Sequence, residues 1–379
     1  MKIVENTNIA NLSPLASAIY DKLAHNQQML FLTWECEDDE LTNQVAHFLN
    51  HFDAAIAHLK GKVEFMLPLT AFHLMAHRAT SKWPADEELC RSLAKIAANH
   101  TVYWRAGRFD FNVSAKPIIY GIMNITPDSF YDGGRYNTPE AMREHIRQMV
   151  AAGADVIEVN GQTTKPGGYK EVSPEEELAR IVPGIKMLQK EFPNVAIAVD
   201  TYKLPVMEKV LAMGVDIIND VRAFDDQRKL LLLKNSRAGL VTMHSSRDRE
   251  YGNLTVEMKH FFEHNLAKIS EAGINLDRVI IDEGIGYSKV ADGEQDYAMM
   301  RNIDEFRYLN RPIMVAISRK GFGKKLFDLP KDERLPVTLI AETYMYLHGG
   351  RVLRVHDIEE TRQLVKMIDT ITAGYWQRG

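Results

Sequence analysis

The sequence has little cysteine, no long hydrophobic run and no surplus of positive charge. Its 379 residues include only Cys36 and Cys90, which form no C-x-x-C motif, so no zinc or redox motif is present. So few cysteines indicate a reducing compartment, and we expect a cytoplasmic protein. The most apolar stretch, 63–76, is interrupted by Pro68 and His73 and is too short to span a bilayer. We therefore expect no membrane partner.

The charge balance excludes a second class of partner. The chain has 46 basic and 51 acidic residues, a net charge of -5 at pH 7 with neutral histidine. This balance provides no overall attraction to nucleic acid, so a site for anions must gather its positive charge locally. Apolar residues make up 45% of the chain and charged residues 26%, which is typical of a globular protein.

A regular alternation of short apolar runs and longer amphipathic stretches begins at residue 118. The runs are nearly continuous rather than alternating, which is typical of strands buried on both faces of a parallel sheet. There are eight of them: 118–123, 156–159, 196–199, 216–218, 239–243, 278–281, 312–317 and 351–355.

The stretches between the runs carry helix signals. Ser173, Pro174 and Glu176 form a capping box, and Thr138 precedes Pro139 in the same way. Eight βα units in about 260 residues match the size of a TIM (β/α)8 barrel. A doubly wound sheet is the alternative, but no Gly-x-Gly-x-x-Gly turn supports it.

The first part of the chain lacks this rhythm. A strand at 31–34 and helices at 41–58 and 86–99 indicate a small α/β domain over residues 1–105, whose role the sequence does not reveal. The barrel is predicted to occupy 106–379. Several histidines lie in the first domain, but no carboxylate or cysteine pattern accompanies them, so packing and surface roles are favoured over metal binding.

Every predicted barrel strand is followed by polar residues. The carboxyl ends of the strands form the active-site face of a TIM barrel, so these side chains are expected to share one mouth. A single Asn or Asp there is usually a turn former or a helix cap, but eight such ends are difficult to explain in that way. The residues are Asn124, Asn160, Asp200, Asn219 with Asp220, His244, Asp282, Ser318 with Arg319 and Lys320, and Arg354 with His356.

The chemistry of these side chains suggests a ligand. Asp282 and Asn219 suit the N–H and amino groups of a flat nitrogen-rich ring. Positive charge gathers after the last two strands, where barrels often bind phosphate. Oxygen ligands for Mg²⁺ are available from Asn124, Asp128, Asp132 and Asp200.

These motifs resemble the dihydropteroate synthases. The run 121–130, Gly-Ile-Met-Asn-Ile-Thr-Pro-Asp-Ser-Phe, followed by Asp132-Gly-Gly, is similar to the first strand and loop of that family. Further matches follow in order at 164–167, 199–203, 218–221, 282–289, 318–322 and 354–357. The resemblance covers about 109–372 and leaves out the N-terminal domain.

The resemblance implies a reaction and a set of roles. Members of the family join 6-hydroxymethyl-7,8-dihydropterin pyrophosphate to 4-aminobenzoate, release pyrophosphate in folate biosynthesis and are sulfonamide targets. It implies that Asp132, Lys320, Arg354 and His356 act in catalysis and that Asn124 binds Mg²⁺. The substrate-binding residues it implies are Phe130, Thr164, Lys165, Pro166, Asp200, Asn219, Asp282, Ser318 and Lys320, and it implies a homodimer.

The chain departs from the family pattern at four places. Lys165 stands where the family has arginine, which would clamp phosphate through two parallel hydrogen bonds. Glu283 replaces a proline, Gly321 replaces a frequent serine, and Ser-Ser-Arg-Asp follows His244 in place of a Gln-Gly pattern. These changes affect the loops and the aminobenzoate pocket rather than the pterin and phosphate groups.

Two alternatives remain at this stage. A pterin-binding methyltransferase-type barrel would share the Asn and Asp that hold pterin, but it has no pyrophosphate to bind, so the cations near 319 and 354 argue against it. A non-catalytic pterin-binding partner in the folate pathway is the other alternative, and a turnover assay separates it from the enzyme.

Overall fold

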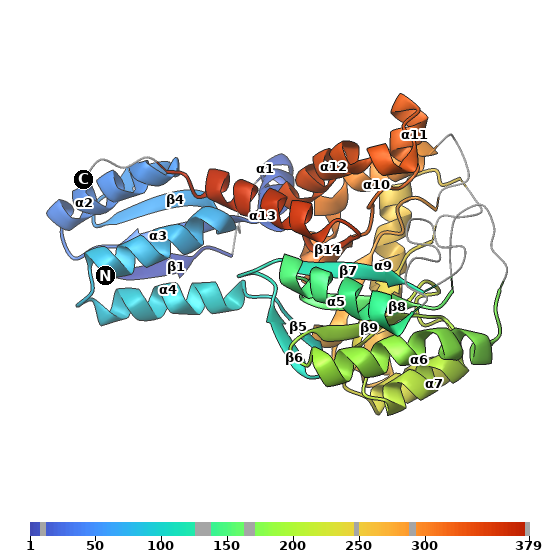
Figure 1. Cartoon of the computed structure of the whole chain (residues 1–379). Coiled ribbons are helices and arrows are strands. Elements are labelled where there is room, and N and C mark those ends of the chain that lie inside the picture. The colour runs from blue at the N-terminus through green and yellow to red at the C-terminus, as the bar shows by residue number, and fades with distance from the viewer. Residues whose placement is uncertain (8–12, 126–137, 163–170, 246–249, 288–292, 376–379) are drawn as a thin grey trace. The chain divides into compact units, whose positions relative to one another are not determined.

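The chain forms two compact units in the computed structural model, which describes residues 1–7, 13–125, 138–162, 171–245, 250–287 and 293–375 (Figure 1). One unit comprises Met1–Thr101 with Lys366–Gly379, and the other comprises Val102–Val365. The boundary therefore falls close to the one expected near residue 105, but the end of the chain joins the first unit. Within that unit, the Tyr375 ring lies 5.5 Å from the Phe52 ring.

The first unit is an α/β fold around an antiparallel sheet with the strand order β1-β2-β4-β3. The strands are β1 (Lys2–Glu5), β2 (Met29–Glu35), β3 (Ala55–Leu59) and β4 (Lys62–Pro68). The helices are α1 (Pro14–Asp21), α2 (Asp39–Leu49), α3 (Leu69–Lys82) and α4 (Glu87–Asn99). Trp34 on β2 is fully buried and makes edge contacts with Phe48 and Trp83, so an aromatic cluster forms the centre of this core.

The expected helix at 41–58 is wrong in its second half. Helix α2 ends at Leu49, Asp53 adopts a left-handed conformation with φ 51°, and the chain continues as strand β3. The segment Ala55–Leu59 is short, and its apolar residues fit either periodicity, so its pairing with β4 decides its structure. The helix expected at 86–99 is confirmed as α4.

The second unit confirms the TIM barrel. Its described residues include eight parallel strands that close in the order β10-β11-β12-β13-β14-β7-β8-β9. The strands are β7 (Ile118–Asn124), β8 (Val156–Asn160), β9 (Ala196–Asp200), β10 (Ile217–Asp220), β11 (Gly239–Met243), β12 (Val279–Asp282), β13 (Ile313–Val315) and β14 (Gly350–Val355). Most side chains of these strands are buried, as expected for strands covered on both faces.

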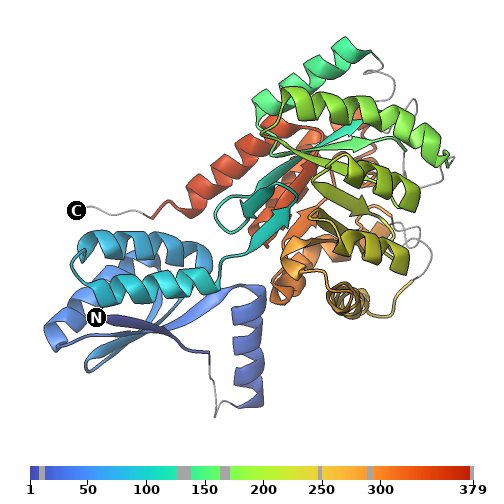
Figure 2. The ribbon, with the colours of Figure 1, turned by 90° about the horizontal axis from the view of Figure 1, so that it is seen from below.

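Helices surround the barrel. They are α5 (Pro139–Ala152), α6 (Pro174–Glu191), α7 (Leu204–Ala212), α8 (Gln227–Lys234), α9 (Leu254–Glu271), α10 (Glu294–Arg301), α11 (Phe322–Phe327), α12 (Leu335–Leu347) and α13 (Ile358–Thr372). Of these, α5 and α6 begin at the two predicted start signals. The Ser173 hydroxyl accepts the Glu176 N–H at 3.2 Å, which caps α6. Gly153 ends α5 with φ 96°, a conformation that favours glycine. Figure 2 shows the barrel unit from a second side.

A hairpin that the sequence analysis did not predict lies at the amino ends of the strands. Strands β5 (Tyr103–Ala106) and β6 (Phe109–Asn112) pair with each other, and β5 contacts β11 and β12. Trp104 is fully buried, and its indole N–H donates to the Arg278 carbonyl at 2.9 Å. The hairpin therefore closes the end of the barrel opposite to the predicted active site.

The cysteines and the apolar helices also bear on the expectations drawn from composition. Cys36 and Cys90 are both free thiols. Across the described parts of the chain, no helix combines the length and apolar character required to cross a membrane.

Candidate active site at the carboxyl ends of the barrel strands

The predicted site residues that the structure describes come from strands around the whole barrel. Asn124, Asp200 and Asp282 end β7, β9 and β12, Asn219 and Arg354 are the next-to-last residues of β10 and β14, and Ser318, Lys320 and His356 follow β13 and β14. Six other predicted residues, Asp128, Phe130, Asp132, Thr164, Lys165 and Pro166, lie outside the described residues. Their assigned roles stay predictions.

Glu158 on β8 joins several of these groups, and the sequence analysis missed it. Its carboxylate is fully buried and accepts hydrogen bonds from both Nε (3.0 Å) and a terminal nitrogen of Arg354. It also accepts from the amide nitrogens of Asn160 and Asn219, each at 3.0 Å, and from the Tyr120 hydroxyl at 2.9 Å. An ionised carboxylate accepts hydrogen bonds and donates none, so each of these neighbours must direct a donor atom toward it.

Acceptor atoms remain available above Glu158. Within the described residues, Oδ1 of Asn160, Asp200 and Asn219 is buried and has no hydrogen-bond partner. Buried polar atoms are normally paired, so an unpaired group of this kind is ready for the donors of a ligand. The carbonyl oxygen of Asn219 is available because its amide nitrogen already donates to Glu158.

Asp282 and Lys320 form the next part of the site. Oδ1 of Asp282 accepts the Gly284 N–H at 2.8 Å, and Asp282 is buried. The Lys320 ammonium donates to the Ile285 carbonyl and lies 4.9 Å from the centroid of the Tyr287 ring. Carboxylate and ammonium thus reach the mouth from neighbouring strand ends, and the positive charge of Lys320 lies above an aromatic face.

Burial and nearby charges shift the pKa values of these carboxyl groups in different directions. Burial, together with the Glu158 carboxylate, raises the pKa of Asp200 to about 8 although Arg354 opposes the shift. Burial also raises the pKa of Asp282, and Lys320 opposes it. Burial acts in the same direction on Glu158, but Arg354 and the donated hydrogen bonds outweigh it and lower its pKa. Glu158 therefore carries the negative charge that balances Arg354, and Asp200 is mostly protonated at pH 7.

Arg354 lies deeper than a surface phosphate clamp. Besides Glu158, its terminal nitrogen donates to Oδ2 of Asp200 at 3.1 Å, and its side chain is only 14% exposed. Its neighbour in the predicted cationic group, Arg319, is used elsewhere, since it forms two 2.7 Å hydrogen bonds with Asp357. Arg319 therefore fixes the loops after β13 and β14.

Asn124 is the predicted magnesium ligand. Its Oδ1 accepts the Asn160 amide N–H at 3.2 Å, which directs the oxygen and leaves it a second lone pair. Within the described ranges, no three His, Cys, Asp or Glu residues cluster as a metal site would require. A single amide oxygen is compatible with Mg²⁺, because this ion often keeps several water ligands and is also bound by the phosphate oxygens of the substrate.

The two stems of the segment 163–170 are tied together by Lys203. The Lys203 ammonium donates to Gln162 Oε1 (2.5 Å), to the Val172 carbonyl (2.5 Å) and to Glu177 Oε2 (2.8 Å). Its side chain is 8% exposed, and that of Glu177 is 2% exposed. This buried ion pair uses the cation of Lys203, so Lys203 is not available to bind a substrate anion.

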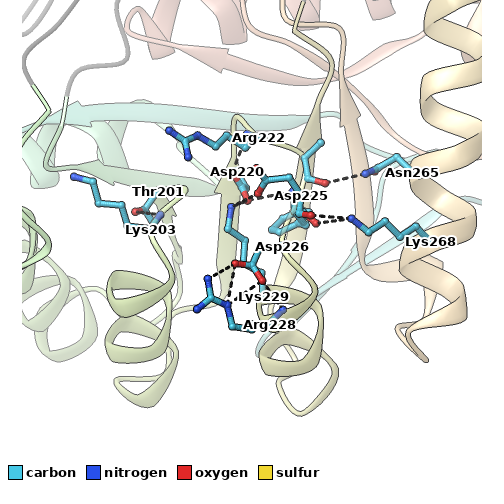
Figure 3. A network of polar contacts seen from close by, with 12 residues as sticks. Thr201, Lys203, Asp220, Arg222, Asp225, Asp226, Arg228, Lys229, Asn265 and Lys268 are labelled. Carbon is cyan, nitrogen blue, oxygen red and sulfur yellow. Dashed lines mark hydrogen bonds and ion pairs between the residues drawn. The ribbon is translucent and has the colours of Figure 1, made fainter.

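The loop after β10 forms a rigid part of the rim (Figure 3). The buried Asp220 accepts from the Lys229 ammonium and from the Arg222 backbone N–H, each at 2.8 Å. This loop places the guanidinium of Arg222 4.0 Å from the centroid of the Tyr202 ring. The Tyr202 hydroxyl in turn donates to Glu171, so the rim and the stem of segment 163–170 are connected.

Glu283, one of the departures from the family pattern, is fully buried. Neither of its carboxyl oxygens has a hydrogen-bond partner within the part of the chain that the structure describes. Burial raises its pKa well above the ordinary value, and the Asp282 carboxylate contributes in the same direction. Glu283 is therefore expected to be a neutral acid behind the site.

Comparisons with known proteins give a consistent result. The model of the pterin binding enzyme family matches residues 120–356. The dihydropteroate synthase of Clostridium beijerinckii is 34% identical over 271 residues, which cover 70% of this chain and 98% of that protein. The enzyme of Escherichia coli K12 is 32% identical over 262 residues, covering 67% and 92%.

Solved structures agree with these relatives. The Yersinia pestis dihydropteroate synthase in complex with a sulfonamide drug aligns with a TM-score of 0.67 and 28% identity, covering 72% of this chain and 100% of that one. The Burkholderia cenocepacia enzyme complexed with 7,8-dihydropteroate aligns with a TM-score of 0.65 and 27% identity, covering 73% and 99%.

Proposed function

This chain belongs to the dihydropteroate synthases of the pterin binding enzyme family, and we infer that it forms 7,8-dihydropteroate. The substrates are 6-hydroxymethyl-7,8-dihydropterin pyrophosphate and 4-aminobenzoate. The bond between the pterin methylene carbon and the bridging oxygen breaks, and pyrophosphate leaves with the electron pair. The aniline nitrogen forms the new C–N bond and loses one proton.

The observation that carries this inference is the set of unpaired acceptors inside the barrel. A reduced pterin presents ring N–H groups and a 2-amino group along one edge, and these donors require buried acceptors at fixed positions. Oδ1 of Asn160 and Asn219 are such acceptors among the described residues, Asp282 adds a carboxylate, and the buried Oδ1 of Asp200 is a further unpaired polar atom. Hydrogen bonds made in a water-poor pocket discriminate strongly between ligands, because a mismatched ligand leaves them unmade.

The charged residues support departure of pyrophosphate. Lys320 and Arg354 bring two positive charges to the strand ends, where negative charge develops on the leaving oxygen. Asn124 would hold Mg²⁺ through its amide oxygen, and the ion would neutralise charge on the departing pyrophosphate.

The aminobenzoate side rests on the family resemblance. We propose that Phe130, Lys165 and Pro166 contact this substrate and that Asp132 helps to stabilise the cationic intermediate. We expect Lys165→Ala to raise the aminobenzoate KM and lower kcat while pterin binding changes little, and Lys165→Arg to be tolerated. We also propose that sulfonamides compete at this position.

A homodimer is supported by apolar side chains on the outside of the barrel. Ile340, Tyr344 and Leu347 lie at helical spacing along α12 and form one exposed stripe, with Ile340 71% exposed. An outer barrel helix normally shows polar residues there, so we propose that a second copy covers this stripe. Light scattering should show a dimer that Ile340→Glu converts to a monomer, whereas the exposed Val256→Glu on α9 should not. A monomeric wild type would contradict the dimer.

The experiment that tests the reaction is pyrophosphate release. Release should require the pterin pyrophosphate, 4-aminobenzoate and Mg²⁺ together. Release that does not depend on 4-aminobenzoate would indicate hydrolysis instead. Pterin binding without any release would favour a non-catalytic pterin-binding partner.

A further inference from the structure

Glu158 lies at the meeting point of groups that serve different parts of the substrate. It projects from β8, and its donors come from β7, β8, β10 and β14, so it connects strands on both sides of β8 within one arc of the barrel. Among them, Arg354 belongs to the pyrophosphate side and Asn219 to the pterin side. Asn160 links Glu158 to Asn124 on the proposed metal side.

We propose that Glu158 is a positioning residue that sets the pterin, pyrophosphate and metal groups of the site at the same time. This proposal rests on the proposed function and names a residue that acts through its neighbours rather than on substrate. Its carboxylate accepts from the amide nitrogens of Asn160 and Asn219, so the Oδ1 atoms of both residues are left for the ligand. The Asn160 amide nitrogen also donates to Oδ1 of Asn124. It also holds Arg354 inside the barrel.

The length and the charge of the side chain both matter. In Glu158→Gln, the new side-chain NH₂ group would face groups that themselves donate hydrogen bonds. This repulsion favours rotation of the Asn219 amide or movement of Arg354 away from residue 158. An aspartate would be shorter by one carbon–carbon bond, about 1.5 Å, and would not reach all the partners at hydrogen-bond distance. Glutamate is therefore the side chain that satisfies this set of donors.

Two ligands measured separately distinguish positioning from a structural role. Calorimetry with 7,8-dihydropterin, which lacks pyrophosphate, reports the amide orientation, and calorimetry with inorganic pyrophosphate reports Arg354. In Glu158→Gln we expect the dihydropterin Kd to rise at least tenfold, whereas pyrophosphate affinity is retained or increases because Arg354 is released. Tyr120→Phe removes one donor that has no substrate role and should change either Kd less than threefold.

A second variant is informative even if Glu158→Gln does not fold. Asn160→Ala removes the amide that joins Glu158 to Asn124, so it should raise the Mg²⁺ concentration for half-maximal activity at least threefold at saturating pterin pyrophosphate, where loss of its Oδ1 acceptor no longer limits pterin binding. An unchanged Mg²⁺ requirement would overturn the link to the metal side.

The remaining outcomes are also decisive. Unchanged dihydropterin binding in Glu158→Gln, or equal weakening of both ligands, would overturn the positioning role while the proposed function stands. Failure of the wild type to bind dihydropterin would contradict the proposed function itself, and the role of Glu158 would fall with it.

Discussion

The Ser318 hydroxyl oxygen lies 3.0 Å from Nδ1 of His356 and accepts the backbone N–H of the same histidine at 3.2 Å. The hydroxyl has a second lone pair and one hydrogen, so it can pair with Nδ1 in either tautomer of the ring. Burial lowers the pKa of His356 to about 4. His356 is therefore neutral at pH 7 and adds no positive charge to the predicted anion site.

The titration of His356 tests this state. Followed by NMR of the imidazole in the protein without ligand, His356 should remain neutral until the pH approaches 4. Because the folded pKa lies below the unfolded value of about 6.5, the folded protein should lose stability as the pH falls from about 6.5 to 4. An imidazole that titrates near pH 6.5 would show that His356 is solvated.

Replacement of Glu283 should stabilise the protein. Its raised pKa means that its contribution to stability is full below about pH 4.5 and is lost as the pH rises, since ionisation of the buried group is then penalised. Glu283→Gln should raise Tm more at pH 8 than at pH 5, and at the higher pH the free energy of unfolding should increase by an amount on the order of 1–3 kcal/mol. The matched control is Glu333→Gln at an exposed position, which should have little effect. Equal Tm changes at both pH values would show that Glu283 is not neutral in the fold.

The hairpin before the barrel should be required for folding of the second unit. A chain that starts at residue 102 keeps Trp104, whereas a chain that starts at Arg105 loses its buried ring and its hydrogen bond to Arg278. Loss of a buried Trp typically costs about 3–5 kcal/mol, so circular dichroism should show a folded first variant and a strongly destabilised second one. Equal melting curves would contradict a structural role for the hairpin.

Gly321 is a position where a hydroxyl can be added. A Cβ built on Gly321 would meet no heavy atom within 4 Å, and its φ of -68° suits any residue. Gly321→Ser should lower the aminobenzoate KM about tenfold, because a hydrogen bond to a charged group contributes about 1.5 kcal/mol or more. Gly321→Ala has the same backbone without the hydroxyl and should resemble the wild type. If the serine and alanine variants behave alike, the aminobenzoate carboxylate does not lie here.

The sequence predicted the barrel well because its strands are buried on both faces. Each one is therefore a continuous apolar run, and the residue that follows it, such as Asp282, is placed at the mouth by the fold. Glu158 could not be predicted in this way because it lies inside the apolar run 156–159 of strand β8 rather than at the strand end. Its importance becomes visible only when Tyr120, Asn219 and Arg354 arrive from other strands.

Other features depended on contacts that a single sequence does not show. The strand Ala55–Leu59 was predicted as helix because a short run with apolar residues fits two periodicities, and its partner β4 decides between them. The role of Lys203 likewise follows only from its contacts with Gln162, Val172 and Glu177, which come from the preceding βα unit.

Transfer of nitrogen from 4-aminobenzoate to pterin tests the central claim most directly. With ¹⁵N-labelled 4-aminobenzoate, the pterin pyrophosphate and Mg²⁺, mass spectrometry should detect ¹⁵N-dihydropteroate in equal amount to the released pyrophosphate. Asp282→Asn should lose about 2–4 kcal/mol of pterin binding, because a donor then faces a donor, and should form product only at much higher substrate concentration. The exposed Asp328→Asn, at a left-handed position that asparagine tolerates, should match the wild type. Folded wild-type protein that forms no labelled product, or an Asp282→Asn variant as active as the wild type, would contradict the account.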